Sequence, residues 1–494
     1  MYYISTRDSG LRYSASQAIV QGLSRDGGLF LPSEIPQIHA SDIAALSSMS
    51  YAQRAAFIMN LYLDEFTNEE LETYANLAYG ENKFDHASIA PVSSIDKDRY
   101  MLELWHGPTC AFKDMALQML PYLLTASLKK TGESRTVCIL VATSGDTGKA
   151  ALEGFCDVPG TKILVFFPRD GVSDIQKLQM ITQSGSNVGV CSVLGNFDDA
   201  QNGVKQIFSD TEIRETLDRR GYFLSSANSI NWGRVLPQIV YYISAYCDLV
   251  ARGDITPGEK MNFSVPTGNF GNILAGWYAK QMGLPIGRLI CASNENNVLT
   301  EFIQTGKYNR LRPFRTTSSP SMDILISSNL ERLLFNLYQS DKTVSGLMKD
   351  LSEVGCYKID HDILDHIQNE FYAGWCTDRD SKKAIEKLYD DREYLMDTHT
   401  AVAWTVSEQY YRETGDSCKT VIVSTASPFK FCSSVLDAFH ISDQLPGTEI
   451  IDQLASVTNT QAPKPLASLS EKNIRFTQCT PKEDMGNIVR EFLT

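Results

Sequence analysis

From about residue 134 onward, apolar runs rich in β-branched residues alternate with helical segments, and this alternation restricts the fold more than any other feature. Continuous apolar runs are typical of strands that are buried on both faces, as in parallel sheets covered by helices. The extended segments are TVCILVAT, TKILVFFP, NVGVCSVLG, GYFLSSANS, MNFSVP, RLICASN and TVIVS. The sequence therefore predicts an α/β fold with doubly wound, mainly parallel sheets, in which ligands bind at the carboxyl ends of the strands.

Two other regions have a different pattern. Residues 1 to about 95 carry apolar residues at helical spacing, in SASQAIVQGL and SYAQRAAFIMNLYLDEF, with turn residues between them. Residues from about 300 to 400 are charged and helical. We expect a mostly helical N-terminal domain (1–95), followed by a core (96–494) that contains a helical insertion at about 300–400.

Charge and cysteine content exclude several classes of protein. The net charge of −14 over 494 residues argues against a nucleic-acid partner. The 11 cysteines are scattered singly, without the spacing of a zinc site, so we expect no metal. The start, MYYISTRDSGLRYS, does not resemble a signal peptide, and no apolar run reaches the roughly 20 residues that span a bilayer. We expect a cytoplasmic protein with no membrane partner.

A single lysine among apolar and small residues, Lys113 in TCAFKD, is the leading candidate for chemistry. Lysine is rarely buried without a partner, and burial lowers its pKa. A neutral lysine amine forms a Schiff base with an aldehyde, most often pyridoxal phosphate. The alternative is that Lys113 lies on the solvent-exposed face of the helix that follows it, DMALQMLPYLL.

Three loops follow predicted strands and open helices, the position in which parallel sheets bind ligands. TGNFGN (267–272) contains glycines that allow close backbone approach, at a helix N-terminus that attracts phosphate. SGDTG (144–148) offers hydroxyl and amide donors, but Thr143 and Ala150 stand where a nucleotide-binding P-loop needs glycine and a hydroxyl residue. The third loop, STASP (424–428), places a hydroxyl group that is equally compatible with a helix cap.

Several longer motifs make the chain similar to one family over nearly its whole length. They are YISTRD, GLSRDGGLFLP, HGPTCAFKD, ATSGDTGKAA, SSANSINWGRVLPQIVYY, VPTGNFGNILAG, SPSMDILISSNLERLLF, DTHTAVAW and STASPFKF. With these motifs the chain resembles the threonine synthases, pyridoxal-phosphate enzymes of the two-lobed fold type II. The resemblance favours the form of the family that has the long helical insertion.

The resemblance implies a role for particular residues. Lys113 would carry pyridoxal phosphate as a Schiff base and move protons, and Thr425 would hydrogen-bond the pyridine nitrogen. The residues that would cradle the cofactor phosphate are Gly268, Asn269, Phe270, Gly271 and Asn272. Those that would hold the substrate carboxylate are Ser144, Gly145, Asp146 and Thr147. Candidates for the leaving phosphate are Ser226, Asn228, Asn231, Arg234 and Lys430, with Lys149 behind them.

Three positions depart from the pattern usual in the family. Thr398 replaces proline in DPHTAVA, and Ser427 and Phe429 replace histidine and alanine in STAHPAKF. The last two changes put local substrate contacts in doubt.

The implied reaction converts O-phospho-L-homoserine and water to L-threonine and phosphate. Two alternatives remain: a lyase of the threonine dehydratase or phospholyase type that stops at a 2-keto acid, and an inactive relative that serves as a binding protein. The sequence leaves open whether the protein is a monomer or a homodimer.

Overall fold

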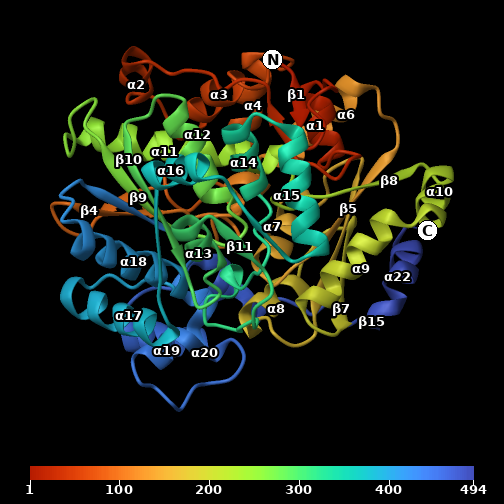
Figure 1. Ribbon diagram of the computed structural model, residues 1–494. Coiled ribbons are helices and arrows are strands. Elements are labelled where there is room, and N and C mark those ends of the chain that lie inside the picture. Colours follow the sequence, from red (N-terminus) through yellow and green to blue (C-terminus); the bar gives the residue numbers. More distant parts are fainter. Residues whose placement is uncertain (494) are drawn as a thin grey trace.

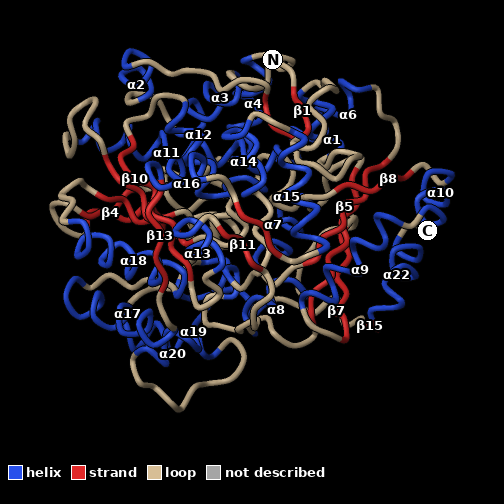
Figure 2. Tube along the Cα trace, in the orientation of Figure 1, coloured by secondary structure: helices blue, strands red, loops and turns tan. Residues whose placement is uncertain are grey.

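The computed structural model describes residues 1–493 and is built around two sheets, which lie on opposite sides of the molecule (Figures 1 and 2). The larger sheet has the order β13-β10-β9-β14-β4-β3, and all its neighbouring strands are parallel except β3 and β4. Its strands are β3 (Val92–Ser94), β4 (Arg99–Glu103), β9 (Met261–Pro266), β10 (Ile286–Ser293), β13 (Phe371–Trp375) and β14 (Thr420–Ser424). β3 and β4 were not predicted from the sequence.

The smaller sheet has the order β15-β7-β6-β5-β8 and is parallel throughout. Its strands are β5 (Thr136–Ala142), β6 (Thr161–Pro168), β7 (Val188–Leu194), β8 (Tyr222–Ser225) and β15 (Cys479–Pro481). The runs TVCILVA and TKILVFFP are almost entirely buried, as strands covered on both faces must be. The two-lobed, mainly parallel α/β fold is therefore confirmed.

Helices on both faces cover the smaller sheet (Figure 1). They are α7 (Asp146–Phe155), α8 (Asp174–Ile181), α9 (Phe197–Ser209), α10 (Thr211–Arg219) and α22 (Met485–Phe492). Ala200, Val204 and Ile207 recur at helical spacing along α9 and pack into one apolar cluster with Leu140 and Val489. This amphipathic spacing lets one face of α9 pack against the sheet.

The longest helix, α11 (Trp232–Arg252), runs through the middle of the molecule and is buried along nearly its whole length. Asn231 caps its N-terminus, and Gly253 ends it in the left-handed conformation. Because most of its side chains are buried, other elements must cover it, and α3 (Tyr51–Asn60) and α12 (Gly271–Gln281) both pack against it.

The N-terminal segment, predicted to be mostly helical, contains four helices that hold fewer than half of residues 1–95. It contains β1 (Tyr3–Ser5), α1 (Ala15–Gln21), β2 (Phe30–Pro32), α2 (Ala40–Leu46), α3 and α4 (Asn68–Ala78), followed in the core by α5 (Asp114–Leu117) and α6 (Leu120–Thr131). Capping boxes at Ser14, Ser50 and Thr67 start three of these helices. The apolar side chains of this segment belong to the same buried cluster as those of the larger sheet. The domain boundary near residue 95 therefore stays a prediction.

In the segment expected to be a helical insertion, helices hold more than half of the residues and three short strands lie between them. It contains α13 (Val298–Thr305), β11 (Lys307–Asn309), η1 (Pro320–Met322), α14 (Leu330–Tyr338), α15 (Asp341–Glu353), β12 (Cys356–Lys358), α16 (His361–Glu370), β13 and α17 (Asp378–Arg392). β13 extends the larger sheet beside β10, with Leu289 opposite Phe371. The expectation missed this strand because FYAGW is too short to stand out from its helical neighbours.

The last part of the chain completes both lobes. Its elements are α18 (Thr398–Thr414), β14, η2 (Pro428–Phe431), α19 (Cys432–Ala438), α20 (Glu449–Thr458), α21 (Lys464–Ala467), η3 (Ser468–Glu471), β15, η4 (Lys482–Asp484) and α22. α18 packs against β9, β10, β13 and β14. Among the residues that the structure describes, no helix is long and apolar enough to cross a membrane. The described side chains, which do not include that of residue 198, contain no group of three or more His, Cys, Asp or Glu that could hold a metal ion.

Candidate active site

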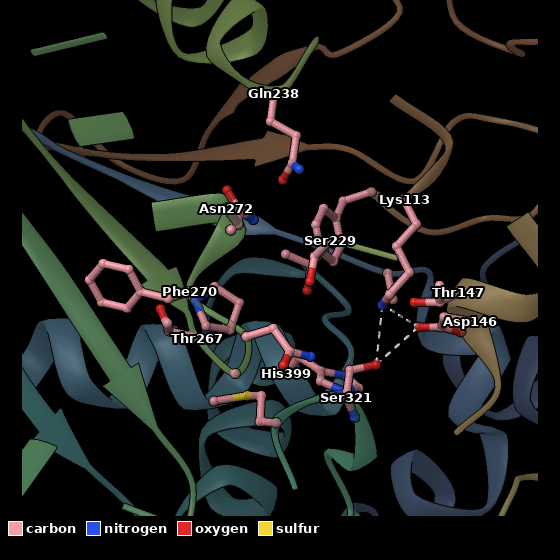
Figure 3. A pocket seen from close by; sticks show the side chains of 18 of the residues that line it. Lys113, Asp146, Thr147, Ser229, Gln238, Thr267, Phe270, Asn272, Ser321 and His399 are labelled. Carbon is pink, nitrogen blue, oxygen red and sulfur yellow. Dashed lines mark hydrogen bonds and ion pairs between the residues drawn. The ribbon is translucent and has the colours of Figure 1, made fainter. Parts of the chain in front are cut away.

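One pocket gathers most of the predicted residues, at the carboxyl ends of strands of the larger sheet (Figure 3). Strands β9 and β14 lead directly into its wall, and the start of α5, the start of α7, α11 and the turn η1 complete it. The lining residues are Phe112, Lys113, Asp146, Thr147, Ser229, Arg234, Gln238, Pro266, Thr267, Gly268, Asn269, Phe270, Gly271, Asn272, Ser321, Met322, His399, Thr425 and Ala426.

Lys113 is buried and points into this pocket, which rules out the alternative of a solvent-exposed lysine (Figure 3). The backbone beside it is fixed to β14, because the Phe112 amide donates to the Thr425 carbonyl. Its Nζ donates to Asp146 Oδ2 and to Ser321 Oγ, both at 3.2 Å. Burial lowers the pKa of Lys113; Asp146 opposes the shift, and the positive charges of Lys430 and Arg234 add to it.

Asp146, at the start of α7, faces Lys113 from the other lobe. Its Oδ1 accepts a hydrogen bond from Gln176 at 2.8 Å and lies 3.1 Å from Lys430 Nζ. Burial alone would raise the pKa of this carboxyl group, but the charges of Lys430 and Lys113 outweigh burial and hold the pKa well below its usual value. Asp146 is therefore a buried carboxylate.

The TGNFGN loop places backbone and side-chain donors at one end of the pocket. Phe270 takes the left-handed conformation (φ 62°), which turns the chain sharply into α12 at Gly271. The first N–H groups of a helix have no partner within the helix. Asn272 Nδ2 is also buried without a hydrogen-bond partner, while Tyr241 and Tyr242 fix the oxygen of the same amide. An unpaired buried donor beside free amides fits an anion.

Arg234, on the first turn of α11, is a second feature that favours an anion. It is buried, and no carboxylate among the described residues pairs with it. One of its terminal nitrogens donates to the Ala227 carbonyl, and its Nε has no partner. Burial lowers the pKa of Arg234 to about 10, so it remains a cation at neutral pH. An uncompensated buried cation is costly unless a ligand supplies the opposite charge.

Thr425 directly follows β14 and lines the pocket. Its hydroxyl makes no hydrogen bond to any of the residues that the structure describes. Its carbonyl is the acceptor that anchors Phe112. The alternative that this side chain is a helix cap is not supported here, because Ser427 rather than Thr425 caps the turn η2.

Other predicted residues lie away from the pocket wall. Thr143 Oγ1 accepts from the amides of Gly145 and Gly148, so the SGDTG loop is fixed largely by its own contacts, and Ser144 and Gly145 do not line the pocket. Asn231 uses its amide to cap α11 and to bind the Ile19 and Ser226 carbonyls.

Among the candidates for the leaving phosphate, Ser226, Asn228, Asn231 and Lys430 are all absent from the pocket wall, whereas Arg234 forms part of it. Lys149 binds Glu153 and Gln183 instead. Lys430 is fully buried behind Asp146. Asn231, Lys149 and Lys430 are poorly placed for the roles predicted for them, because donors that are used inside the protein are not available to a ligand. The roles of Ser226 and Asn228 stay predictions.

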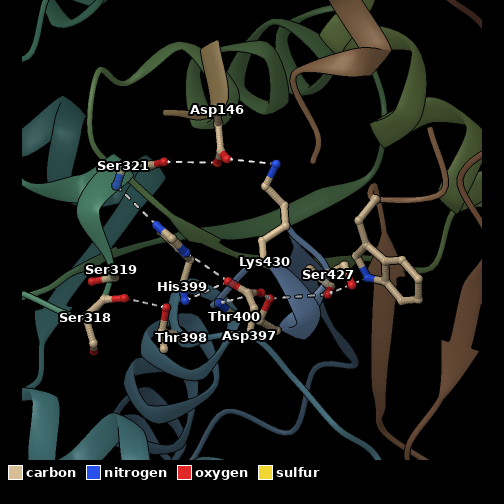
Figure 4. A network of polar contacts seen from close by, with 12 residues as sticks. Asp146, Ser318, Ser319, Ser321, Asp397, Thr398, His399, Thr400, Ser427 and Lys430 are labelled. Atoms are coloured by element: carbon tan, nitrogen blue, oxygen red, sulfur yellow. Dashed lines mark hydrogen bonds and ion pairs between the residues drawn. The ribbon is translucent and has the colours of Figure 1, made fainter. Parts of the chain in front are cut away.

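Several pocket residues were given no role from the sequence, among them Ser229, Ser321, Met322 and His399. His399 accepts a hydrogen bond on Nε2 from the Ser321 amide (3.2 Å), and its Nδ1 lies 2.9 Å from Asp397 Oδ1 (Figure 4). These contacts fix the turn that carries Ser321 against Lys113. The motifs SPSMDIL, DTHTAVAW and SSANS contained these residues, so the motifs themselves were the available signal.

The three departures from the family pattern are accommodated in the structure. Thr398 Oγ1 donates to the Ser318 carbonyl at 2.7 Å, and Ser427 accepts from the Phe429 amide at 3.3 Å. Phe429 is buried in the apolar cluster of α18 and α19. None of the three lines the pocket.

The pocket suits pyridoxal phosphate. An amine with a lowered pKa would bind the aldehyde, the free donors of the TGNFGN loop and Asn272 would hold the phosphate, and the Thr425 hydroxyl would face the ring. Residues 99–426 match the family described as pyridoxal-phosphate dependent enzyme. The fold and the pocket thus define a pyridoxal-phosphate-dependent enzyme.

Comparison with known proteins narrows this class. Residues 2–79 match the threonine synthase N terminus family and residues 400–490 the threonine synthase C-terminal family. Threonine synthase-like 1 of Homo sapiens is 41% identical over 460 residues, which are 89% of this chain and 61% of that relative's length. Threonine synthase of Schizosaccharomyces pombe is 37% identical over 463 residues, 88% of each chain. The chain belongs to the threonine synthase family.

A solved structure supports the same assignment. Pyridoxal-phosphate-bound threonine synthase from Brucella melitensis superimposes with a TM-score of 0.87 at 38% identity, covering 100% of this chain and 99% of that one. The shared fold extends over both lobes and the N-terminal segment.

Gly271→Val is expected to weaken cofactor binding while leaving the fold intact. A Cβ atom at Gly271 meets Asn329 at 3.4 Å, which is ordinary contact, so the protein itself tolerates a side chain. The added methyl groups occupy space beside the amides of the loop, and we expect the dissociation constant to rise about tenfold or more. Gly346→Val, in an open position on α15, is the control. Equal cofactor affinity in the two variants would show that the phosphate is bound elsewhere.

Proposed function

We propose that this protein is a threonine synthase that converts O-phospho-L-homoserine and water to L-threonine and phosphate. The observation that carries the proposal is that one pocket contains two separate features for anions, the TGNFGN loop and Arg234, together with a lysine whose pKa is lowered. One feature suits the phosphate of the cofactor and the other the phosphate of the substrate.

Lys113 is proposed to move the protons of the reaction. Pyridoxal phosphate bound here would supply an electron sink for the negative charge left when a proton leaves Cα. Lys113 Nζ, when it is not bonded to the cofactor, would accept the proton that leaves Cα, release it, and then accept the proton that leaves Cβ. Ser321 Oγ, 3.2 Å from Lys113 Nζ, orients the amine for these transfers.

Arg234 and Ser229 are proposed to bind the leaving phosphate. Both line the pocket, and Arg234 has an unpaired buried N–H. Charge-assisted hydrogen bonds to a phosphate are stronger than neutral ones and stabilise the negative charge as the C–O bond breaks. Thr147 and the free amides at the start of α7 are proposed to hold the substrate carboxylate, since a helix N-terminus favours negative charge.

An end-point assay tests the proposal. We expect the purified protein to produce threonine and phosphate in equal amounts from O-phospho-L-homoserine, with little 2-keto acid. A 2-keto acid as the main product would instead identify a lyase of the dehydratase or phospholyase type. A protein that binds the cofactor but forms no product would be an inactive relative.

Thr425→Val is expected to lower kcat by about ten- to a hundredfold, the effect of leaving one buried polar atom unmatched. The change keeps the side-chain volume but removes the hydroxyl that we propose for the pyridine nitrogen. Cofactor affinity is expected to fall much less, because the phosphate loop and Lys113 remain. Thr420→Val, a buried threonine at the other end of β14, is the control. An unchanged kcat in Thr425→Val would remove Thr425 from the proposed site.

A further inference from the structure

The carboxylate of Asp146 lies between two lysines: Lys113, which lines the pocket (Figure 3), and Lys430, which does not (Figure 4). Lys113 Nζ lies 3.2 Å from Oδ2 and Lys430 Nζ 3.1 Å from Oδ1. One carboxylate balances one positive charge. The two lysines therefore share one counter-ion, and the hydrogen-bond partners of each lysine determine which of them is the charged partner of Asp146.

The surroundings of Lys430 Nζ suit an ammonium group. It is 0% exposed, and its Nζ has three acceptors: the Thr109 carbonyl and Gln179 Oε1, both at 2.8 Å, and Asp146 Oδ1. Three acceptors match the three N–H donors of an ammonium group, which has no lone pair to offer. With every donor used inside the protein, Lys430 is poorly placed to bind a ligand directly.

Lys113 has a different environment. Its Nζ touches Asp146 and Ser321, borders the pocket, and has no backbone acceptor among the hydrogen bonds of the described residues. Two more charged or titratable groups act on this pair: Arg234, on α11, lowers the pKa of Lys113, and His399, on α18, helps to lower that of Asp146. His399 is itself held by Asp397.

We propose that Lys430 is a positioning residue that serves as the permanent counter-ion of Asp146 and so leaves Lys113 free to be an uncharged amine. An uncharged amine is the form that attacks an aldehyde and that accepts a proton. Without Lys430, the ionised Asp146 would retain Lys113 as its own counter-ion. Asp146 in turn gives Lys113 a fixed hydrogen-bond acceptor that orients it.

The proposal rests on the role proposed above for Lys113, but its test does not depend on the reaction. The charge of Lys113 is measured in the full chain freed of cofactor. Trace labelling with formaldehyde and a borane reductant over a series of pH values, read by mass spectrometry of the peptide that contains Lys113, gives the pH at which this amine loses its proton. A chain that made no threonine would still give this result.

Three variants are expected to change the titration midpoint of Lys113, the pH at which half of this amine has lost its proton, in different ways. In Lys430→Met, Asp146 keeps its charge and Lys113 becomes its counter-ion, so the midpoint is expected to rise by about one to two pH units. In Asp146→Asn, Lys430 is an unbalanced cation nearby, and the midpoint is expected to fall by about one unit or more. In the double variant both charges are gone, and the midpoint is expected to return close to that of the wild type.

Lys280→Met is the matched control. Lys280 is a partly buried lysine in the last turn of α12, and it forms an ion pair with Glu370 of α16. We expect it to leave the Lys113 midpoint unchanged. An unchanged or lowered midpoint in Lys430→Met would overturn the proposal, as would a raised midpoint in Asp146→Asn. If Lys430→Met alone did not fold, the test would rest on Asp146→Asn and on the double variant, which has no unpaired buried charge at this position. A double variant with a midpoint far from that of the wild type would then overturn the proposal.

The holoenzyme gives a second measurement. The nitrogen of Lys113 also has a proton to lose once it is bonded to the cofactor, and this loss changes the visible absorption. We expect the pH at which the visible band shifts to move upward in Lys430→Met and downward in Asp146→Asn. A purely structural role for Lys430 would reduce stability without giving shifts of opposite sign in the two variants.

Discussion

Lys113→Ala is expected to lower turnover by at least about a thousandfold, because it removes both the covalent link to the cofactor and the group that moves protons. The fold is expected to survive, since Asp146 keeps Lys430 as a partner when Lys113 is gone. The measurement is phosphate release from O-phospho-L-homoserine, together with the thermal unfolding midpoint. The wild-type protein is expected to be yellow.

Borohydride reduction of the wild-type holoenzyme is expected to fix the cofactor on the peptide that contains Lys113, and this places the linkage directly. Lys97→Ala, a change at a lysine that is 88% exposed, is the control for the loss of a lysine side chain. Full activity in Lys113→Ala, or a reduced cofactor on another lysine, would contradict the central assignment.

Arg234→Met is expected to lower kcat/KM by about ten- to a hundredfold, the cost of one or two charge-assisted hydrogen bonds to the leaving phosphate. At the same time, the cofactor-free protein is expected to unfold at the same or a higher temperature. The reason is that Arg234 is a buried cation without a carboxylate partner, so its removal relieves an uncompensated charge.

Arg54→Met is the control, because it is expected to change stability and to leave activity unchanged. Arg54 is also buried, but it pairs with Asp248 and donates to Ser244 and to the Leu46 carbonyl, far from the pocket. We expect this change to lower stability and to leave kcat/KM unaltered in the folded protein. If Arg234→Met also lost stability and kept its activity, Arg234 would be a structural residue rather than a ligand of the phosphate.

Local patterns predict much of this fold because they depend on neighbouring residues alone. The buried runs TVCILVA and TKILVFFP form adjacent parallel strands, and TGNFGN turns from β9 into α12 as its glycines suggest. Lys113 could be identified for the same reason, since a charged residue within an apolar stretch is visible in the sequence itself.

Other parts of the site depend on contacts between distant segments, which a single sequence does not display. Ser321 approaches Lys113 only because His399 and the turn η1 hold it there. Asn231 has the side chain of a phosphate ligand, but the start of α11 needs it as a cap. Lys430 has the charge of a ligand, but its acceptors come from α7, α8 and the loop before Lys113. In each case the sequence showed the type of side chain, but it did not show which residue from a distant segment that side chain contacts.

The order of the smaller sheet has a consequence for synthesis of the protein on the ribosome. β7 is flanked by β6 on one side and by β15 on the other, with Cys479 opposite Ser192. The outer edge of β7 and the apolar side chains beneath α22 therefore stay uncovered while everything between residues 194 and 479 is translated. An open strand edge next to apolar surface is prone to pair with other chains. The nascent protein is consequently most vulnerable to aggregation in this lobe, and this vulnerability lasts until residues 479–492 are available to cover the edge of β7 and the apolar surface beside it.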